Sequence, residues 1–599
     1  MAIGLVSGSL LRSLSRRSGS AISDSMVFGL LLGVVGLLIL YGRQMSEGYV
    51  REAPIELTLS ALPAYAGLSL SRCLAAMLLS LVFTIIYGSI AAHSRRAERF
   101  MIPALDVLQT IPVLSFLPPV TLALITLMPG NELGLELACI IMIFTGQAWN
   151  MAFGFYQSIR SVPPSLYEVA KVNRLGPGRT FMRVELPASM IGLIYNSMMS
   201  FAGGWFFLTT IEMFTLKNRD FRLPGIGSWL AMAQQEHRWG LVIVGSLVLV
   251  VLIVGTDQLL FRPLLYWAQK FKVEEQQTQQ PPRSWVVTLW NRSPIVRALR
   301  RHNAARRSMR REKQAASAVA SRTSPKHGMN ASSDDHQMLL RIRGIARVLI
   351  RIVLLAILIA GIVSLARLVW PLPLRGTEER GGWLDVAIGL GCSFGRVMAV
   401  LIVASLWAIP VGLAIGRSTK LRSWLGPVVQ VLASYPSPAY FVVLAVGLAA
   451  FGVPFWIIAA VLMLMGSQWY ILFNAMSGAM AIPSEFSELS RVYRLGWWKR
   501  MWRVDLPAMM PSLVTGWVTA AGGAWNTTIV AEYIQTGLTP SDVMTTPGIG
   551  ELIASSTDTG DFAMLAASTL SLAAFVVIFN RLVWHRLFAL CATRFNLQT

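Results

Sequence analysis

Long apolar runs alternate with short polar segments along most of the 599 residues. A run of about 20 apolar residues is long enough to cross a bilayer as an α-helix, because the hydrocarbon core is about 30 Å thick. The pattern predicts an all-α integral membrane protein with twelve transmembrane helices, six on each side of a polar stretch in the middle. The expected spans are about 26–41, 67–92, 112–127, 133–155, 188–214 and 241–260, then 346–370, 385–416, 435–451, 455–475, 508–534 and 562–582.

One polar segment between two apolar runs occurs twice. Residues 163–188 read PPSLYEVAKVNRLGPGRTFMRVELPA, and residues 483–508 read PSEFSELSRVYRLGWWKRMWRVDLPA. In both copies a glutamate precedes a Leu-Pro pair, and the two segments align without a gap. Further identities recur at offsets of 320 to 324 over about 160 residues. Such nearly constant offsets indicate a tandem duplication, with both halves in the same orientation.

Composition and charge agree with a membrane location. Hydrophobic residues make up 54% of the chain and charged residues only 14%, whereas soluble domains carry about 25% charged residues. The mean hydropathy is +0.56. The net charge of +22 gathers in loops beside apolar runs, which is typical of cytoplasmic loops and not of a nucleic-acid-binding surface. We therefore expect both repeated segments and both termini in the cytoplasm.

The N-terminal run is interpreted as a helix that stays in the membrane. Basic residues precede it, as in a signal peptide, but Gly42-Arg43-Gln44 follows it in place of a small-residue cleavage site. The expected domains are a first six-span unit, 1–268, a basic cytoplasmic linker, 269–344, and a second six-span unit, 345–599. The linker is too polar to order itself fully. Within it, residues 297–314 either form a basic helix on anionic lipid or are simply solvated.

The repeated segment resembles the EAA loop of ABC importer permeases, in which a Glu-Ala-Ala run precedes a Leu-Pro pair at fixed spacing. Here the two runs are Glu168-Val169-Ala170 and Glu488-Leu489-Ser490. Together with a repeated external Pro-Gly-Ile-Gly motif, they resemble permeases of the nitrate, sulfonate, bicarbonate and taurine type, in a fused two-domain form. The resemblance implies a type I importer fold and a location in the bacterial inner membrane.

The chain also departs from that pattern. Where the family usually carries glycine six residues after its glutamate, both copies carry arginine, and a glycine follows two residues later. The resemblance implies that each loop forms a short helix that docks on a separate ATPase subunit. The glutamates would lie at the positive helix start, the glycines would make the turn, the arginines would pair with ATPase carboxylates, and the prolines would begin the next span. The implied coupling residues are Glu168, Ala170, Arg174, Gly176 and Pro187, with Glu488, Ser490, Arg494, Gly496 and Pro507.

The sequence contains no G-x-x-x-x-G-K-[ST] motif for binding nucleotide phosphates. It also shows no His, Cys or carboxylate cluster for a metal and no pairing of nucleophile and base for catalysis. We therefore expect that the chain holds no cofactor and no metal, that it is not itself an enzyme, and that ATP and Mg²⁺ are bound by a partner. Two docking loops in one chain call for two ATPase subunits or one fused ATPase. A periplasmic or lipoprotein substrate-binding protein and membrane lipid are the other expected partners.

Polar residues inside spans are costly and are therefore candidates for function. A matched set near the outer ends of the fifth and eleventh spans is expected either to line the substrate path or to anchor those spans at the interface. The set is Trp205, Glu212, Trp525, Asn526 and Glu532. Arg72 and Arg396 are expected either to attract an anion or to reach lipid headgroups. Asn150, Asn196 and Thr209-Thr210 are weaker candidates.

These features favour the permease subunit of an ATP-driven importer, for a small anion such as nitrate, a sulfonate or bicarbonate. The alternative is an ion-coupled secondary transporter, since two parallel six-span halves also occur in that class. It would need coupling charges near the middle of the membrane. A membrane-bound enzyme or sensor would need a catalytic cluster or a folded soluble domain, and the sequence suggests neither.

Overall fold

The computed structural model describes residues 55–271, 359, 363, 366–376 and 381–594, apart from 217–218, 483, 538–541 and parts of 119–132. The predicted first span, most of the seventh, and the linker beyond residue 271 lie outside the described residues. The chain divides into two compact units, residues 1–254 with 358–599, and residues 255–357. Of the second unit, residues 255–271 are described. They contain a π-helical turn, Asp257–Phe261, and helix α11, Arg262–Ala268.

In the first half the long helices are joined by a pair of short helices and by a β-hairpin. The elements are α2 (Leu62–His93), α3 (Arg95–Thr110), a 3-10 turn (Val113–Phe116), α5 (Leu133–Arg160), α6 (Pro164–Val172), α7 (Pro177–Thr180), a π-helical turn (Phe181–Glu185), α8 (Leu186–Ile211), β1 (Met213–Leu216), β2 (Arg219–Arg222), α9 (Ile226–Gln235) and α10 (Trp239–Thr256).

The second half repeats this order. Its elements are α15 (Trp383–Arg417), α16 (Thr419–Ser434), a 3-10 turn (Ser437–Tyr440), α17 (Phe441–Ala450), α18 (Phe455–Ala481), α19 (Ser484–Val492), α20 (Trp497–Arg500), a π-helical turn (Met501–Asp505), α21 (Leu506–Ala531), β3 (Tyr533–Gln535), β4 (Val543–Thr545), α22 (Ile549–Thr559), α23 (Phe562–Phe579), a π-helical turn (Asn580–Trp584) and α24 (His585–Arg594).

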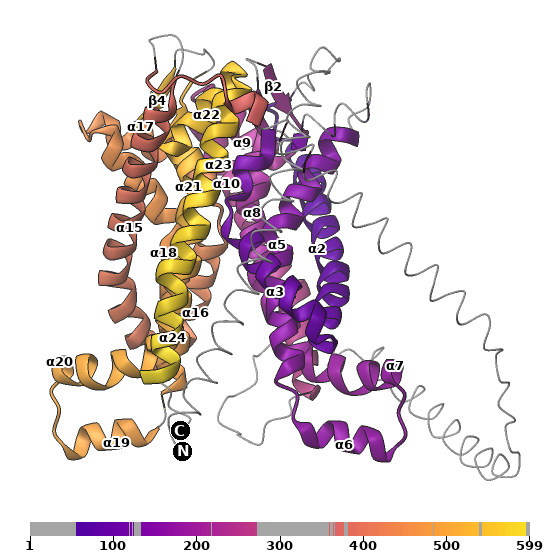
Figure 1. Ribbon diagram of the computed structural model, residues 1–599. Helices are drawn as coiled ribbons and strands as arrows, with labels where there is room; N and C mark the ends of the chain where they lie inside the picture. Colours follow the sequence, from indigo (N-terminus) through magenta and orange to yellow (C-terminus); the bar gives the residue numbers. More distant parts are fainter. Residues whose placement is uncertain are drawn as a thin grey trace, which may run out of the picture. The chain divides into compact units, whose positions relative to one another are not determined.

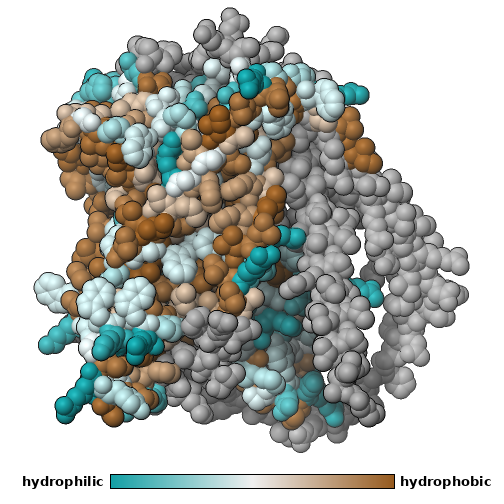
Figure 2. Space-filling view, turned by 60° about the vertical axis from the view of Figure 1, so that its left-hand side comes forward, coloured by the Kyte–Doolittle hydropathy of each residue, from teal (hydrophilic) through white to brown (hydrophobic). Residues whose placement is uncertain are grey.

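Seven helices in the described part of the chain are long and apolar enough to cross a membrane. An eighth candidate is the bent pair α16 and Ser437–Ala450, which turns by 81° at the break. The described residues therefore show seven or eight candidate spans and not the twelve that the sequence predicts. Brown, apolar side chains predominate over the middle of the face in Figure 2, and teal, polar side chains gather toward its upper and lower ends.

Helix α2 illustrates how the sequence divides each span between two environments. Leu78, Val82 and Ile86 recur at i+4 spacing and are exposed, so this stripe faces away from the bundle. The opposite side is built from small residues that let helices approach closely. A methyl group added at Gly88 would lie 2.8 Å from Phe155 of α5, and one at Gly412 would lie 2.6 Å from Ala475 of α18. The two halves therefore share the same close helix packing.

Two basic segments that the sequence pattern assigns to short inner loops are in fact helix starts. Ser94 caps α3 by accepting a hydrogen bond from Ala97 N at 3.3 Å, and Ser418 caps α16 by accepting one from Leu421 N at 3.2 Å. A serine side chain at this position satisfies an otherwise free N–H group of the first turn. Each helix then meets a proline-led break, and in the second half the expected ninth span is one arm of a bent pair with α16.

The segments that follow α8 and α21 are also folded. Strands β1 and β2 pair antiparallel, with Met213 opposite Arg222, and β3 pairs with β4, with Tyr533 opposite Thr545. Each hairpin is followed by a short helix, α9 or α22, that begins inside the Pro-Gly-Ile-Gly motif. In Figure 1 the labelled strands β2 and β4 lie at the end of the unit opposite α6, α7, α19 and α20.

The two halves contact each other through their broken segments. The backbone N–H of Val113 donates to Asn526 Oδ1 of α21 at 2.8 Å. In return, Gln234 of α9 donates to the backbone carbonyl of Ala439 at 2.5 Å. Ile111 packs against Ala573 of α23. The proline-led turn of each half therefore contacts a helix of the other half.

Candidate coupling loops and outer ion-pair networks

The repeated segment folds in the same way in both halves. A nine-residue helix, α6 or α19, is followed by a sharp turn and by α7 or α20, which runs on through a π-helical turn into α8 or α21. Figure 1 shows α6 with α7, and α19 with α20, lying across the direction of the long helices at one end of the unit. Both copies therefore present a short helix beyond the end of the bundle.

The turn after each short helix is a Schellman motif. Leu175 N donates to Ala170 O at 3.0 Å and Arg174 N donates to Lys171 O at 2.9 Å. In the second copy Leu495 N donates to Ser490 O, and Arg494 N to Arg491 O, both at 3.0 Å. This motif requires a left-handed residue after the helix, which is usually glycine.

Arginine holds that left-handed position in both halves. The φ angle is 51° at Arg174 and 47° at Arg494. A residue with a Cβ pays roughly 1–2 kcal/mol for this conformation. The arginine that replaces the family's usual glycine thus takes up the backbone conformation that glycine favours. Both arginine side chains are exposed.

Two roles implied by the resemblance are wrong. Glu168 and Glu488 occupy the fifth position of their helices, beyond the first turn, so neither lies at the helix start. Gly176 and Gly496 have φ of −67° and −61° and precede α7 and α20. An ordinary residue can adopt these angles, so the turn is made by the arginines and not by the glycines.

The position two residues after each glutamate is buried in both copies. Ala170 is 3% exposed and Ser490 is 2% exposed, and the Ser490 hydroxyl donates to Phe486 O at 2.7 Å. The change from alanine to serine therefore keeps a small buried residue. Pro187 and Pro507 lie in the first turns of α8 and α21.

The exposed side of each short helix carries apolar residues as well as charges. Val172 is 83% exposed and Val492 is 79% exposed. The next turn of the same side carries Val169 in one copy and Leu489 in the other, at 57% and 52%. Matching exposed apolar groups beside exposed acidic and basic groups are what a partner-binding surface contains.

A buried carboxylate ties each loop to the bundle, and sequence reasoning missed it. Glu185 is 3% exposed and pairs with His93 Nε2 at the end of α2, at 3.0 Å. The equivalent Asp505 is 1% exposed and pairs with Arg417 at the end of α15 and with Arg500, the latter at 3.8 Å. The signal was present in the repeat, since these positions correspond at offsets of 320 and 324.

In the first half Tyr167 of α6 lies near the Glu185 carboxylate. Burial, and then the neighbouring Glu185 carboxylate, raise the pKa of Tyr167 to about 12. The phenol therefore stays protonated at physiological pH and can donate to the carboxylate. The second copy has Ser487 at this position, and therefore no phenol.

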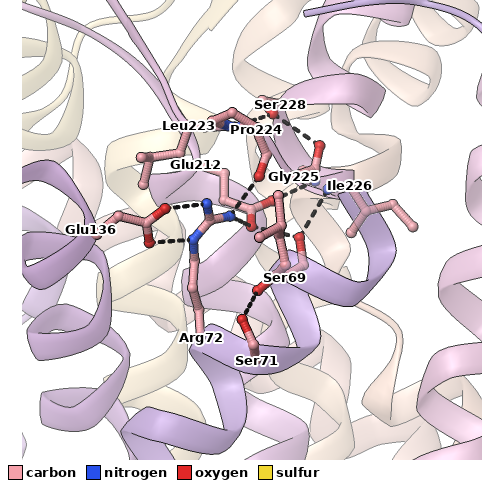
Figure 3. Close-up of polar contacts among 12 residues, drawn as sticks. Ser69, Ser71, Arg72, Glu136, Glu212, Leu223, Pro224, Gly225, Ile226 and Ser228 are labelled. Atoms are coloured by element: carbon pink, nitrogen blue, oxygen red, sulfur yellow. Dashed lines mark hydrogen bonds and ion pairs between the residues drawn. The ribbon is translucent and has the colours of Figure 1, made fainter. Parts of the chain in front are cut away.

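At the opposite end, Arg72 of α2 lies between two carboxylates (Figure 3). Its Nε and Nη2 donate to the two oxygens of Glu136 at 2.7 and 2.5 Å, and its Nη1 donates to Glu212 Oε1 at 2.7 Å and to Pro224 O at 2.9 Å. Arg72 is 3% exposed and Glu212 is fully buried. The alternatives of anion attraction and headgroup contact are both wrong for Arg72, because carboxylates of the chain already occupy its guanidinium.

Glu212 also fixes the external Pro-Gly-Ile-Gly motif. It accepts hydrogen bonds from Ser69 at 2.6 Å and from Gly227 N at 2.7 Å, and Ile226 N donates to Ser69 Oγ at 2.9 Å. The motif's glycines are needed here, because a Cβ at Gly225 would lie 2.3 Å from the Glu212 carboxylate. The network joins α2, α8 and α9.

The second half repeats this arrangement with one difference. Glu532 accepts from Ser393 at 2.7 Å and from Gly550 N at 2.9 Å, and it pairs with Arg396. The Arg396 guanidinium also donates to Pro547 O and, through Nη2, to Thr546 Oγ1 at 3.0 Å. Within the described part of the chain, Arg396 forms no ion pair with a second carboxylate.

The other polar candidates lie at several places in the bundle. Trp205 is 1% exposed with its ring edge-on to Phe201, and Trp525 is 2% exposed beside Phe575. Asn526 makes the contact between halves described above. Asn150 donates to Ser200 Oγ at 3.2 Å, while Asn196, Thr209 and Thr210 donate to backbone carbonyls of their own helix. A role in the substrate path stays a prediction for this set.

Comparison with known proteins matches residues 84–261 and 408–587 to the family described as binding-protein-dependent transport system inner membrane component.

Three relatives are similar over part of the chain. The bicarbonate transport system permease protein CmpB of Synechococcus elongatus is 29% identical over 174 residues, which is 28% of this chain and 59% of the relative. The putative aliphatic sulfonates transport permease protein SsuC of Bacillus subtilis is 27% identical over 221 residues, 36% of this chain and 75% of the relative. The nitrate import permease protein NrtB of Leptolyngbya laminosa is 30% identical over 165 residues, 27% of this chain and 55% of the relative. The matched region thus spans somewhat over half the length of most of these relatives.

Proposed function

Because the chain belongs to the family of binding-protein-dependent transport system inner membrane components, we propose that it is the transmembrane permease subunit of an ATP-driven importer of the ABC type. The family domain occurs twice, so one polypeptide supplies both permease halves. ATP and Mg²⁺ belong to partner subunits in this proposal, and a substrate-binding protein delivers the substrate from outside.

The two matched coupling loops carry the proposal. Each loop projects a helix with an exposed glutamate, an exposed apolar pair and an arginine held in a left-handed turn. A loop that served only to connect two spans would not need the same exposed pattern and the same strained turn in both halves. Since the two docking surfaces match, we propose that two copies of a single ATPase, or two similar halves of a fused ATPase, bind to them.

We further propose a twelve-segment topology in the bacterial inner membrane, with both termini in the cytoplasm. The positive-inside charge pattern supports this orientation. In this proposal the broken segments around residues 95–127 and 419–450 each count as one membrane-embedded segment. The domains remain 1–268 and 345–599, joined by a basic cytoplasmic linker at 269–344.

The proposed substrate is a small oxyanion. The support is that relatives are named as permeases for bicarbonate, nitrate and aliphatic sulfonates, all of which carry delocalised negative charge on oxygen atoms. An ion-coupled secondary transporter remains the alternative. It is disfavoured because the buried charges of the described residues are engaged in matched structural ion pairs: Arg72, Glu212, Arg396 and Glu532 at one end of the bundle, and Glu185 and Asp505 beside the two loops.

Site-specific cross-linking tests the docking proposal. Val172→Cys and Val492→Cys place a thiol at the most exposed large apolar position of each loop, and Cys392 lies in α15, away from both loops. A short bifunctional cross-linker in native membranes should join both variants to an ATPase polypeptide of the same mass. The proposal loses its basis if neither loop position cross-links to an ATPase. It also loses its basis if a cysteine on a β-hairpin cross-links to the ATPase as well as the loop cysteines do.

A further inference from the structure

The guanidinium of Arg396 has an unused donor edge. Its Nη1 binds Glu532, and its Nη2 binds Thr546 and Pro547. Among the described residues, no acceptor lies within hydrogen-bond distance of its Nε. The side chain is 11% exposed, so the guanidinium is mostly withdrawn from water yet reachable at one edge. The Nε edge is therefore open to an acceptor from outside the chain, and a hydrogen bond from a charged donor is stronger than one from a neutral donor.

The first half shows what fits such an edge. There, Nε and Nη2 of Arg72 hold both oxygens of Glu136 in a two-point contact, while Nη1 binds the buried Glu212. One guanidinium at this position in the fold therefore accommodates two carboxylates at once. Figure 3 shows Glu136 and Glu212 on opposite sides of the Arg72 head.

The residue that corresponds to Glu136 in the second half is Trp456. Gly88 faces Ala152 and Phe155, and Gly412 faces Leu472 and Ala475, so α5 and α18 correspond at an offset of 320. That offset places Trp456 where Glu136 lies. Trp456 is 58% exposed and carries no carboxylate, so the second half lacks the internal anion that neutralises this edge in the first.

We propose that the Nε edge of Arg396 is a binding site for an oxyanion, which takes the place that the Glu136 carboxylate occupies on Arg72. The ligand's first oxygen would accept from Nε. Its second would accept from Nη2 in place of the neutral Thr546 hydroxyl, which is the weaker acceptor. Planar or tetrahedral oxyanions suit this two-point geometry, as carboxylates and phosphates do on arginine generally.

Two sources can supply such a ligand at the outer end of the bundle. One is a soluble oxyanion such as nitrate, bicarbonate or sulfate. The other is the phosphate of a lipid headgroup, which the exposed Trp456 would flank at the membrane interface, where tryptophan is enriched. The inference rests on the geometry of the two halves and does not depend on the proposed transport function.

The test installs the missing carboxylate. Trp456→Glu should place an internal anion on Arg396, as Glu136 does on Arg72, and Trp456→Gln is the matched neutral control. The full-length chain, purified in detergent, is titrated with sodium nitrate, bicarbonate or sulfate against sodium chloride, and with short-chain phosphatidylglycerol. Binding is followed as the rise in the thermal unfolding midpoint and by native mass spectrometry.

We expect the wild type and Trp456→Gln to bind one of these probes, and Trp456→Glu to weaken that binding at least tenfold. Trp456→Glu should also raise the midpoint in the absence of ligand. A response to the salts alone identifies a soluble oxyanion, and retained phosphatidylglycerol identifies a lipid. The proposal is overturned if no probe binds the wild type, or if all three proteins bind with the same affinity.

Discussion

Arg174 and Arg494 lie 320 residues apart and hold the same left-handed backbone conformation, with φ of 51° and 47°. Each ends a short helix by donating its N–H to the carbonyl three residues earlier. A position that most sequences would give to glycine thus carries a long cationic side chain twice. Because both halves place arginine where the turn favours glycine, these two side chains are the first to test for a role in binding a partner.

Charge reversal at both arginines tests that need. The double variant Arg174→Glu, Arg494→Glu should lose ATPase association or ATP-driven transport by at least tenfold, because it replaces the exposed cation of each docking surface by an anion. Co-purification of the ATPase with the tagged chain measures this. Full association and full transport in the double variant would count against docking through these residues.

The matched control is Arg174→Gly, Arg494→Gly, which keeps the turn and removes the side chain. Glycine adopts the left-handed region without a Cβ penalty, so each substitution should leave the free energy of unfolding unchanged or raise it by up to about 1–2 kcal/mol, which is read as an unchanged or higher thermal unfolding midpoint. If the glycine variant unfolds earlier than wild type, the backbone argument is wrong.

Loss of the buried glutamate should cost more in the second half than in the first. Glu532→Ala leaves Arg396 without any carboxylate, whereas Glu212→Ala leaves Arg72 bound to Glu136 at 2.5 Å. Breaking a buried ion pair costs about 3–5 kcal/mol. The thermal unfolding midpoint in one detergent should therefore fall further for Glu532→Ala. Equal falls would show that the two networks are energetically equivalent.

The Pro-Gly-Ile-Gly motifs should not tolerate a Cβ. A methyl group at Gly548 would lie 2.1 Å from the Glu532 carboxylate, and one at Gly225 would lie 2.3 Å from that of Glu212. Overpacking of this kind costs about 1–3 kcal/mol. Gly548→Ala and Gly225→Ala should lower the midpoint, while Gly240→Ala, where nothing lies within 4 Å, should not. A tolerated Gly548→Ala would mean that Glu532 is free to move.

The buried acid of each loop should matter for coupling more than for docking. Asp505→Asn leaves Arg417 and Arg500 without the carboxylate that they share, so α20 is less firmly held to α15. We expect the ATPase still to co-purify while substrate uptake falls several-fold. Loss of both in parallel would instead assign Asp505 to folding of the loop.

The repeat made much of this fold predictable from the sequence. Apolar runs located α2, α5, α8, α15, α18 and α21 to within several residues, because the length and hydropathy of a span are local properties. The twin loops were found because their spacing is identical. The helices α3 and α16 were missed, because their basic first turns resemble inner loops and only the Ser94 and Ser418 caps distinguish them.

Contacts between distant residues were harder to predict. Arg72, Glu136 and Glu212 come from three separate helices, and nothing in a single sequence says that an intramembrane arginine meets two acids rather than lipid. The left-handed turn at Arg174 was visible only as a departure from a family pattern. A repeated polar residue tells where a network lies, but the partners depend on how helices pack.

Uptake by reconstituted chain tests the central claim most directly. The tagged chain is purified with the ATPase that accompanies it, placed in liposomes, and given radiolabelled nitrate, bicarbonate or a sulfonate together with its binding protein. The account predicts uptake that requires ATP, persists without any ion gradient, and is abolished by the double Arg174→Glu, Arg494→Glu substitution. Uptake driven by a sodium or proton gradient in liposomes that contain the chain alone would contradict it.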